Sequence, residues 1–319
     1  IFIYQVHLHI LIMQIHRDIN SLPQFRNAVI TIGTFDGVHL GHRQIIDSLK
    51  EEAAKANGES VIITFHPHPR KVVSSVITGV RLINTLDERI ELLEKTGIDH
   101  LVIVPFTEYF ANQEAEDYIS DFLVDKFNPH TIIIGYDHRF GKERSGDYKM
   151  MEEKALVYNY QLKEIPEHIQ NAVKVSSTNI RNAILHSNIE EASSFLGYDF
   201  FFEGEVFHGD KIGREIGYPT ANLKSTDDEK IVLGDGIYAV YCVVEGETYK
   251  GMMSIGFRPT VNGRVRVTEV NIFDFDKQIY GEKIRVIVKK YLRAEVKFNG
   301  LEELKIALHK DKVDSLKCL

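Results

Sequence analysis

The sequence is short of cysteine, of excess positive charge and of long apolar runs, and each shortage excludes a class of protein. The two cysteines, Cys242 and Cys318, lie far apart, which argues against a disulfide framework or a four-ligand zinc site and fits a reducing cytoplasm. The formal net charge of -8 argues against a general nucleic-acid binder. Any positive charge that a ligand needs must therefore come from particular sites.

The first twelve residues are apolar, but they fall well short of the roughly 20 residues that a membrane-spanning helix requires. They also lack the basic start and the small-residue cleavage site of a signal peptide. Because the sequence does not begin with Met and a more ordinary sequence follows Met13, we interpret Met13 as the biological start and residues 1–12 as an extension. The alternative is that these residues form an extra edge strand.

Residues 13–186 alternate short apolar runs with amphipathic stretches, a pattern that predicts an α/β domain with a mostly parallel sheet. A helix is expected over residues 43–57 because its apolar residues recur at helical spacing. Strands are expected at residues 29–34, 60–65, 100–104 and 131–135. The 319-residue length and the apolar fraction of 44% leave room for a second core.

The pattern of apolar and polar residues changes beyond residue 186. A short helix is expected there first, and it is expected to stop at Gly197. The runs that follow alternate or are β-branched and are joined by short turns, which predicts an antiparallel sheet closed into a small barrel. Its strands are expected at residues 200–207, 236–244, 248–255, 264–273 and 283–291, and Asn299 is expected to cap a closing helix through about His309. Residues 187–319 are therefore predicted to form a second domain that folds alone.

The segment from Gly33 to His42 lies between an expected strand and an expected helix. In a parallel sheet such a turn presents backbone N–H groups and a helix dipole to an incoming anion, and glycines allow a phosphate to approach closely. His39 and His42 are three residues apart, so both imidazoles can point toward one place if the helix begins near His39. An imidazole can donate a hydrogen bond to a phosphate oxygen and carry charge in the transition state. The alternative is a tight turn with two solvated histidines.

Three further loops of the first half carry polar residues. Pro67 and Pro69 hold an extended loop that carries two histidines and two basic residues, and residues 135–147 resemble a phosphate loop only superficially, because the Walker spacing fails. The run from Val175 to Arg181 places three hydroxyl groups and a guanidinium at a helix start, which suits the binding of phosphates. Each loop alone has a structural alternative: a stiff surface loop, a turn or an ordinary N-cap.

The second half has one distinctive loop, from Gly209 to Asn222. Three glycines and two basic residues can wrap phosphates, while Thr220 and Asn222 present oxygen ligands to a hard cation such as Mg²⁺. Glu269 lies in a later expected strand, where a carboxylate could take the proton of an alcohol. The alternatives are a turn-rich hairpin and a solvated Glu.

Together these motifs resemble the prokaryotic bifunctional riboflavin kinase/FAD synthetases, in family order from Met13 to about Asp314. The resemblance implies a Rossmann-like nucleotidyltransferase domain at residues 13–186 and a riboflavin kinase β-barrel at residues 187–319. It implies ATP, riboflavin and FMN as substrates, Mg²⁺ with the ATP, and no membrane or nucleic-acid partner. The loop at residues 135–147 departs from the family at His138, where an aromatic ring is usual.

The same resemblance assigns roles to residues of this sequence. It implies catalytic roles for His39, His42, Arg181 and Glu269, and a metal site at Thr220 and Asn222. The residues that it places at the flavin are His66, Pro67, His68, Asp137, Arg293 and Phe298. The residues that it places at ATP are Gly33, Phe35, Asp36, Gly41, Ser176, Ser177, Thr178, Gly209, Lys211, Gly213 and Arg214. Two rival functions remain, a nucleotidyltransferase for another phosphorylated acceptor and a degenerate flavin-binding protein.

Overall fold

The computed structural model describes residues 12–73, 81–135, 137–165, 177–209, 212–260 and 263–319. The chain divides into two compact units, one made of residues 1–80 and 86–174 and the other of residues 81–85 and 175–319. Within the described ranges, no helix is long and apolar enough to cross a membrane.

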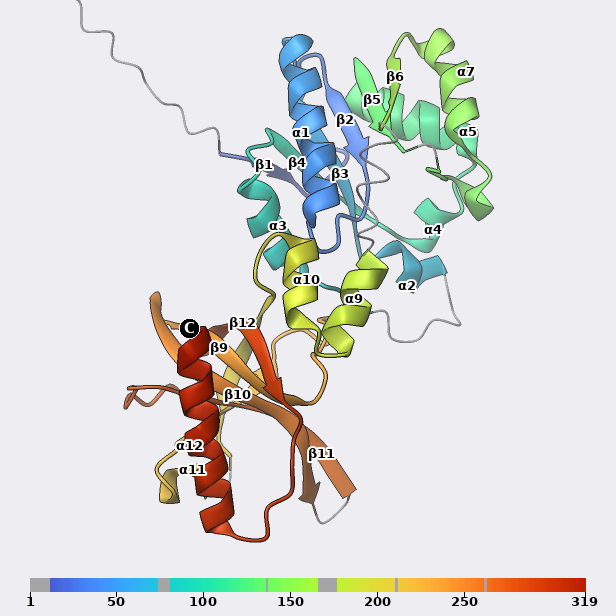
Figure 1. Cartoon of the computed structure of the whole chain (residues 1–319). Coiled ribbons are helices and arrows are strands. Elements are labelled where there is room, and N and C mark those ends of the chain that lie inside the picture. Colours follow the sequence, from blue (N-terminus) through green and yellow to red (C-terminus); the bar gives the residue numbers. More distant parts are fainter. Residues whose placement is uncertain (1–11, 74–80, 136, 166–176, 210–211, 261–262) are drawn as a thin grey trace, which may run out of the picture. The chain divides into compact units, whose positions relative to one another are not determined.

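The first unit alternates strands and helices, as Figure 1 shows. Its strands are β1 (Gln14–His16), β2 (Val29–Ile32), β3 (Ser60–His66), β4 (His100–Pro105), β5 (Thr131–Ile134) and β6 (Gln161–Glu164). Its helices are α1 (Leu40–Lys55), α2 (Pro69–Val73), α3 (Leu86–Glu94), α4 (Glu108–Ala111), α5 (Ala115–Asp117), the π-helix η1 (Tyr118–Val124), α6 (Asp125–Phe127), the 3-10 helix η2 (Lys142–Arg144) and α7 (Tyr148–Tyr158).

The six strands form one sheet in the order β1-β4-β3-β2-β5-β6, and every neighbouring pair is parallel. The predicted parallel sheet is thus confirmed. From β2 the chain builds outward through β3 and β4 on one side, and then returns to place β5 on the other side of β2. Ligands of α/β proteins bind where the strand order reverses in this way, at the carboxyl ends of the strands.

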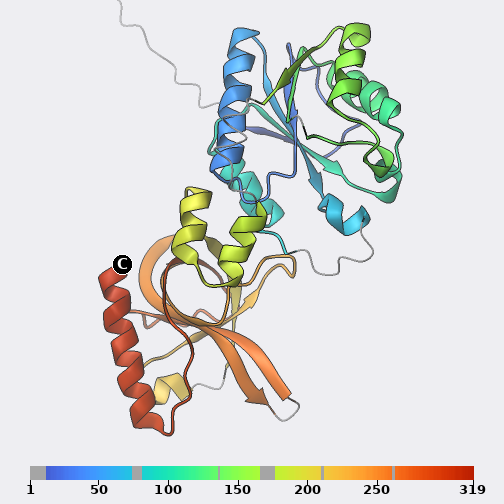
Figure 2. The same ribbon diagram turned by 45° about the vertical axis from the view of Figure 1, so that its right-hand side comes forward.

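Apolar side chains cover both faces of this sheet. Ile30 and Ile63 of the sheet share a core cluster with Phe122 of η1 and Met151 of α7. Helix α1 contacts β2 and β3, and Figures 1 and 2 show it on the other side of the sheet from α5 and α7. Because the strands are buried on both faces, they read as continuous apolar runs rather than as alternating ones.

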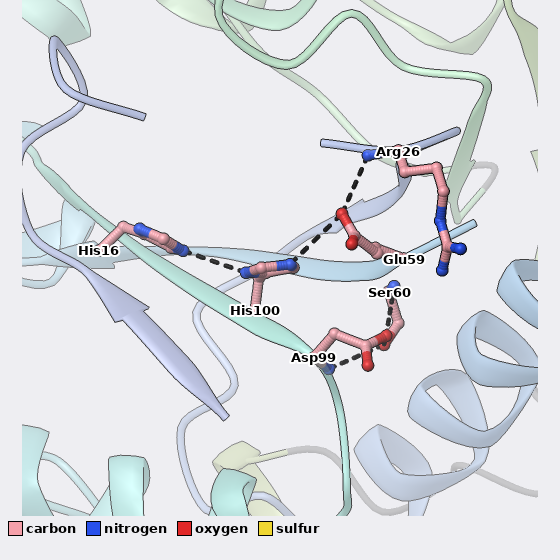
Figure 3. Close-up of polar contacts among 6 residues, drawn as sticks. All are labelled: His16, Arg26, Glu59, Ser60, Asp99 and His100. Atoms are coloured by element: carbon pink, nitrogen blue, oxygen red, sulfur yellow. Dashed lines mark hydrogen bonds and ion pairs between the residues drawn. The ribbon is translucent and has the colours of Figure 1, made fainter. Parts of the chain in front are cut away.

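A polar network joins the amino ends of β3 and β4 to the edge strand β1 (Figure 3). The backbone N–H and the hydroxyl of Ser60 both donate to Asp99 Oδ2, at 2.8 and 2.7 Å. His100 lies between Glu59 and His16, with Nε2 3.5 Å from Glu59 Oε2 and Nδ1 3.1 Å from His16 Nε2. Burial and the neighbouring His100 lower the pKa of His16. These contacts lie at the end of the sheet opposite the carboxyl ends of its strands.

The second unit begins with two helices and continues as a barrel (Figures 1 and 2). Its helices are α9 (Ser177–Leu185), α10 (Ile189–Leu196), α11 (Ile212–Glu215) and α12 (Leu301–Cys318). Its strands are β7 (Phe201–Phe207), β8 (Ala221–Ser225), β9 (Gly236–Val244), β10 (Glu247–Thr260), β11 (Gly263–Ile272) and β12 (Lys283–Arg293). They close in the antiparallel order β10-β11-β8-β7-β12-β9, which confirms the predicted barrel.

The barrel core extends into the helices before it. Ile180 and Ile184 of α9 belong to one buried cluster with barrel residues such as Met253 and Val286. Ile83, from the short segment of residues 81–85, belongs to the same cluster. The predicted domain boundary at residues 186/187 stays a prediction, and this packing favours a division near residue 175 instead.

Two local predictions differ from the structure. The closing helix is capped by Gly300 rather than Asn299, although the Asn299 backbone N–H donates to Glu303 Oε2 at 3.0 Å, and it continues to Cys318. Strands β1, β6 and β8 were not predicted, because three to five residues give little periodicity to detect. Helix α10 ends at Gly197 in the left-handed region, as predicted.

Candidate active sites

The turn between β2 and α1 lies at the point of the sheet where the strand order reverses. Three of its residues, Phe35, Gly37 and Val38, have φ values of 48°, 93° and 35°. Glycine adopts this region freely, but Phe35 and Val38 do so at a steric cost, while both are almost completely buried. Backbone strain of this kind concentrates at functional sites.

Two histidines are stacked at the start of α1. His39 is the N-cap residue, and its Nδ1 accepts a hydrogen bond from the His42 backbone N–H at 3.3 Å. The two ring centroids are 3.7 Å apart with an interplanar angle of 17°. The two rings thus lie side by side at the helix start, and their convergence on one ligand position stays a prediction.

The electrostatic environment of His42 opposes its protonation. Burial, followed by His39 and Arg89, lowers the pKa of His42 well below its usual value. Its Nδ1 is buried without a hydrogen-bond partner among the described residues. This environment favours the neutral form of the His42 ring.

Arg89 is a site residue that the sequence reasoning missed. It lies on α3, is 3% exposed and donates to the Thr34 carbonyl at 2.6 Å and the Phe65 carbonyl at 3.3 Å. These carbonyls follow β2 and end β3, so the guanidinium ties two strand ends together and places positive charge near His42. The signal in the sequence is an arginine among the apolar residues of α3, where its charge must be partnered if it is buried.

A pocket of about 460 Å³ opens beside this turn. Its walls carry aromatic rings, those of Phe65, Phe106, Phe110, Tyr118 and Phe140, and Gly33 also lines it. The ring centroids of Tyr118 and Phe140 are 5.0 Å apart and those of Phe106 and Phe110 are 5.5 Å apart. Such a pocket suits a planar aromatic ligand.

The predicted flavin residues of the first unit fall into two groups, one that lines this pocket and one that does not. Asp137 and the neighbouring His138 line it, and burial lowers the pKa of His138 to about 4. His66 is exposed, Pro67 is half-buried and His68 is buried, with its Nδ1 accepting from the Arg70 backbone N–H at 3.2 Å; these three do not line the pocket.

The predicted ATP residues divide between the two units. Phe35 and Asp36 are buried in the turn of the first unit, and Gly41 is buried in the first turn of α1. Ser177, Thr178 and Arg181 lie on α9 of the second unit, where Arg181 Nε donates to the Arg81 carbonyl at 2.9 Å. Ser176 lies outside the described residues. A joint site made of His42 and Arg181 therefore stays a prediction.

The second unit has two pockets of about 450 Å³ each, and Thr220 lines both. One is lined by apolar side chains, including Met252, Phe298 and Leu308, together with Glu269, Arg258 and Arg293. The other carries Arg214 and Lys277. A residue shared by two pockets can contact both a ring-bearing acceptor and a phosphate donor.

Thr220, Asn222 and Glu269 come together on neighbouring strands. Asn222 of β8 is paired in register with Glu269 of β11, and Thr220 Oγ1 lies 3.4 Å from Glu269 Oε1. A hydroxyl, an amide oxygen and a carboxylate are the hard oxygen donors that Mg²⁺ takes alongside nucleotide phosphates. The residues present therefore fit the predicted metal.

Two glycines of the preceding loop lie close to their neighbours. A Cβ at Gly209 would lie 2.1 Å from Asn222 Nδ2, and one at Gly213 would lie 2.3 Å from the Tyr218 carbonyl oxygen. Arg214 is exposed and lines the pocket that Lys277 also lines. Lys211 lies outside the described residues.

Arg293 and Phe298 both line the apolar pocket, but Arg293 is already bonded within the protein. Its Nε and Nη2 donate to the two carboxylate oxygens of Asp311 at 2.8 and 2.6 Å. Asp311 lies on α12 and is 2% exposed. The pair therefore fixes α12 against β12 at the wall of the pocket, and a direct contact of Arg293 with the flavin stays a prediction.

Comparison with known proteins gives each unit a class. Residues 22–179 match the family model of FAD synthetase, and residues 196–319 match that of riboflavin kinase. A solved structure titled a macrolide-efflux protein from Streptococcus pneumoniae superimposes with a TM-score of 0.85 at 29% identity, covering 95% of this chain and 98% of that one.

Two relatives match nearly from end to end. A bifunctional riboflavin kinase/FMN adenylyltransferase of Listeria monocytogenes is 37% identical over 91% of each chain. A protein of the same description from Escherichia coli K12 is 36% identical over 94% of this chain and 96% of its own. The chain belongs to the bifunctional riboflavin kinase/FMN adenylyltransferase family.

Proposed function

We propose that this enzyme phosphorylates riboflavin with ATP to give FMN and then transfers AMP from a second ATP to FMN, giving FAD and pyrophosphate. The observation that carries the proposal is that each unit has its own pocket for a ring-bearing ligand and its own set of polar groups for one reaction. The family of both units supports it.

In the second unit, the riboflavin ring occupies the apolar pocket and ATP the pocket that shares Thr220. The ribityl hydroxyl is neutral, so it needs a base, and Glu269 takes its proton as the oxygen attacks the γ-phosphorus of ATP. The bond between that phosphorus and the bridging oxygen breaks, and ADP leaves. Thr220 and Asn222 would hold Mg²⁺, which supplies charge neutralisation on the phosphates.

In the first unit, the flavin ring lies against the aromatic walls of the pocket beside Gly33. An oxygen of the FMN phosphate attacks the α-phosphorus of ATP, and pyrophosphate leaves. Because that phosphate is already an anion, the step needs no general base, and positioning and charge stabilisation suffice. The helix N-terminus, with His39 and His42, supplies hydrogen bonds to phosphate oxygens. Ser177, Thr178 and Arg181 carry groups that bind phosphates, but they belong to the second unit, so their part in this step stays a prediction.

One incubation tests the proposal. The full chain is given riboflavin and Mg-ATP, and the products are separated by chromatography. FMN followed by FAD is the expected result, and a parallel incubation with FMN should yield FAD directly. Absence of FMN excludes the kinase. FMN without FAD excludes the adenylyltransferase and favours another phosphorylated acceptor, which is the rival enzymatic function.

A further inference from the structure

Glu269 is held through one of its two carboxylate oxygens. Arg258 Nη2 forms an ion pair with Glu269 Oε1, and Thr220 Oγ1 lies 3.4 Å from the same oxygen. Glu269 Oε2 accepts no hydrogen bond from the residues that the structure describes. The carboxylate is therefore anchored on one side, and its other oxygen is left for a ligand.

The strand register places Arg258 on the same face of the barrel sheet as this carboxylate. Arg258 of β10 is paired with Val265 of β11, and Val265 is four residues before Glu269, so the two β11 residues are on one face. Arg258 and Glu269 line the same apolar pocket, with side-chain exposures of 31% and 15%. The pair thus lies at the pocket that the proposed function assigns to riboflavin.

We infer that Arg258 is a positioning residue for the kinase reaction, which holds Glu269 Oε1 so that Oε2 receives the proton of the attacking hydroxyl. This inference rests on the proposed function of the second unit. Arginine is suited to the role because its guanidinium stays protonated in proteins and therefore cannot take the proton itself. Its planar fork also fixes a carboxylate more tightly than the single ammonium of a lysine does.

The first test is a pair of variants of the full chain. In Arg258→Gln the carboxylate loses its anchor, so kcat for FMN formation should fall on the order of 100-fold, the loss that a misplacement of about 1 Å can cause. The KM values for riboflavin and ATP should change little. Arg258→Lys keeps the charge but not the fork, so it should recover part of the lost kcat. If Arg258→Gln does not fold, as judged by thermal unfolding, Arg258→Lys alone measures the effect.

A double-mutant cycle separates positioning from direct contact. If Arg258 acts through Glu269, then Arg258→Gln should cause no further loss of kcat in the Glu269→Gln background. Equal losses in both backgrounds, or a rise in KM with kcat unchanged, would show that Arg258 contacts the substrates itself and would overturn the inference.

The matched control is Arg285→Gln. Arg285 forms an ion pair with Glu203 at 2.8 Å, is 28% exposed at its side chain and lies in the same barrel outside this pocket. Its replacement should leave kcat for FMN formation unchanged. A wild-type chain that makes no FMN would overturn the proposed function and the inference with it. An active wild type with an equally active Arg258→Gln would overturn the inference alone.

Discussion

Under the proposed function, the two units present opposite kinds of side chain to a phosphorus centre. The first unit offers two stacked histidines, of which His42 is kept neutral, while the second offers the carboxylate of Glu269 beside a hydroxyl and an amide. The difference follows from the nucleophiles, because a phosphate arrives as an anion and an alcohol does not. The proposed mechanism therefore needs a base in one unit only, and substitutions in the two units should separate the two reactions.

The largest expected effect is that of Glu269→Gln. This change keeps the size of the side chain but removes the base, so kcat for FMN formation should fall roughly 100- to 10,000-fold. The formation of FAD from added FMN should not change, and that activity is the internal control. Kinase turnover at the normal rate would make Glu269 a structural residue and remove the proposed contrast between the units.

The next expected effect concerns where the units divide. A fragment that begins at Ser187 lacks Ile180 and Ile184, two fully buried residues of the barrel core, whose loss should cost about 4 kcal/mol of unfolding free energy at about 2 kcal/mol each. A fragment that begins at Val175 keeps both. We expect the longer fragment to be the more stable in urea titrations and to convert riboflavin to FMN without making FAD.

Two results would contradict this expectation for the fragments. Equal urea midpoints would show that α9 contributes nothing to the barrel core and would favour the division at residue 186. A folded fragment from Val175 without kinase activity would show that the kinase site needs residues of the first unit.

His42→Ala should have a smaller effect, on the other reaction. Removing one hydrogen-bonding group from a charge-stabilising site costs on the order of 100-fold in kcat. We therefore expect FAD formation from FMN to fall by that factor while FMN formation from riboflavin stays nearly intact. Initial rates with each flavin measure the two effects in one preparation, and equal loss of both would contradict a separate site in each unit.

The smallest expected effect is a pH dependence of the first unit. The pKa of His138 is about 4 in the folded protein and about 6.5 when unfolded, so the unfolded chain binds the proton more readily and stability is lost as pH falls from about 6.5 to 4. Proton linkage therefore makes the free energy of unfolding about 2 kcal/mol lower at pH 5 than at pH 8. His138→Phe should remove this loss.

Urea unfolding of the wild type and of His138→Phe at pH 5 and pH 8 measures the difference. His16 and His42 also have lowered pKa values, so both proteins should lose some stability at pH 5, and only the difference between them reports on His138. The same pH dependence in both proteins would show that the His138 ring is solvated.

The sequence was sufficient for the architecture because it rests on local patterns. Continuous apolar runs predicted the parallel sheet, and alternation with short turns predicted the barrel. The stacked pair of His39 and His42 followed from their spacing at a helix start. These features depend on residues that are close in the chain.

Features that depend on distant partners were missed. Arg89 contacts the chain near Thr34 and Phe65, and nothing in its own helix shows which carbonyls it meets. Likewise, the bond from Arg293 to Asp311 and the ion pair from Arg258 to Glu269 depend on which strand or helix lies alongside. The inclusion of α9 in the barrel core could not be predicted either, because an amphipathic helix does not show which core covers its apolar face.

The way each sheet ends bears on association between chains. An open sheet exposes the unpaired N–H and C=O groups of its edge strands, which can template pairing with another molecule. In the first unit the edges are β1 and β6, of three and four residues, and a short edge leaves few such groups. In the second unit the barrel closes, but residues 256–260 of β10 and 263–267 of β11 extend beyond it and pair only with each other. Within the described residues, unpaired strand edges therefore remain in both units, short in the first and on this hairpin in the second.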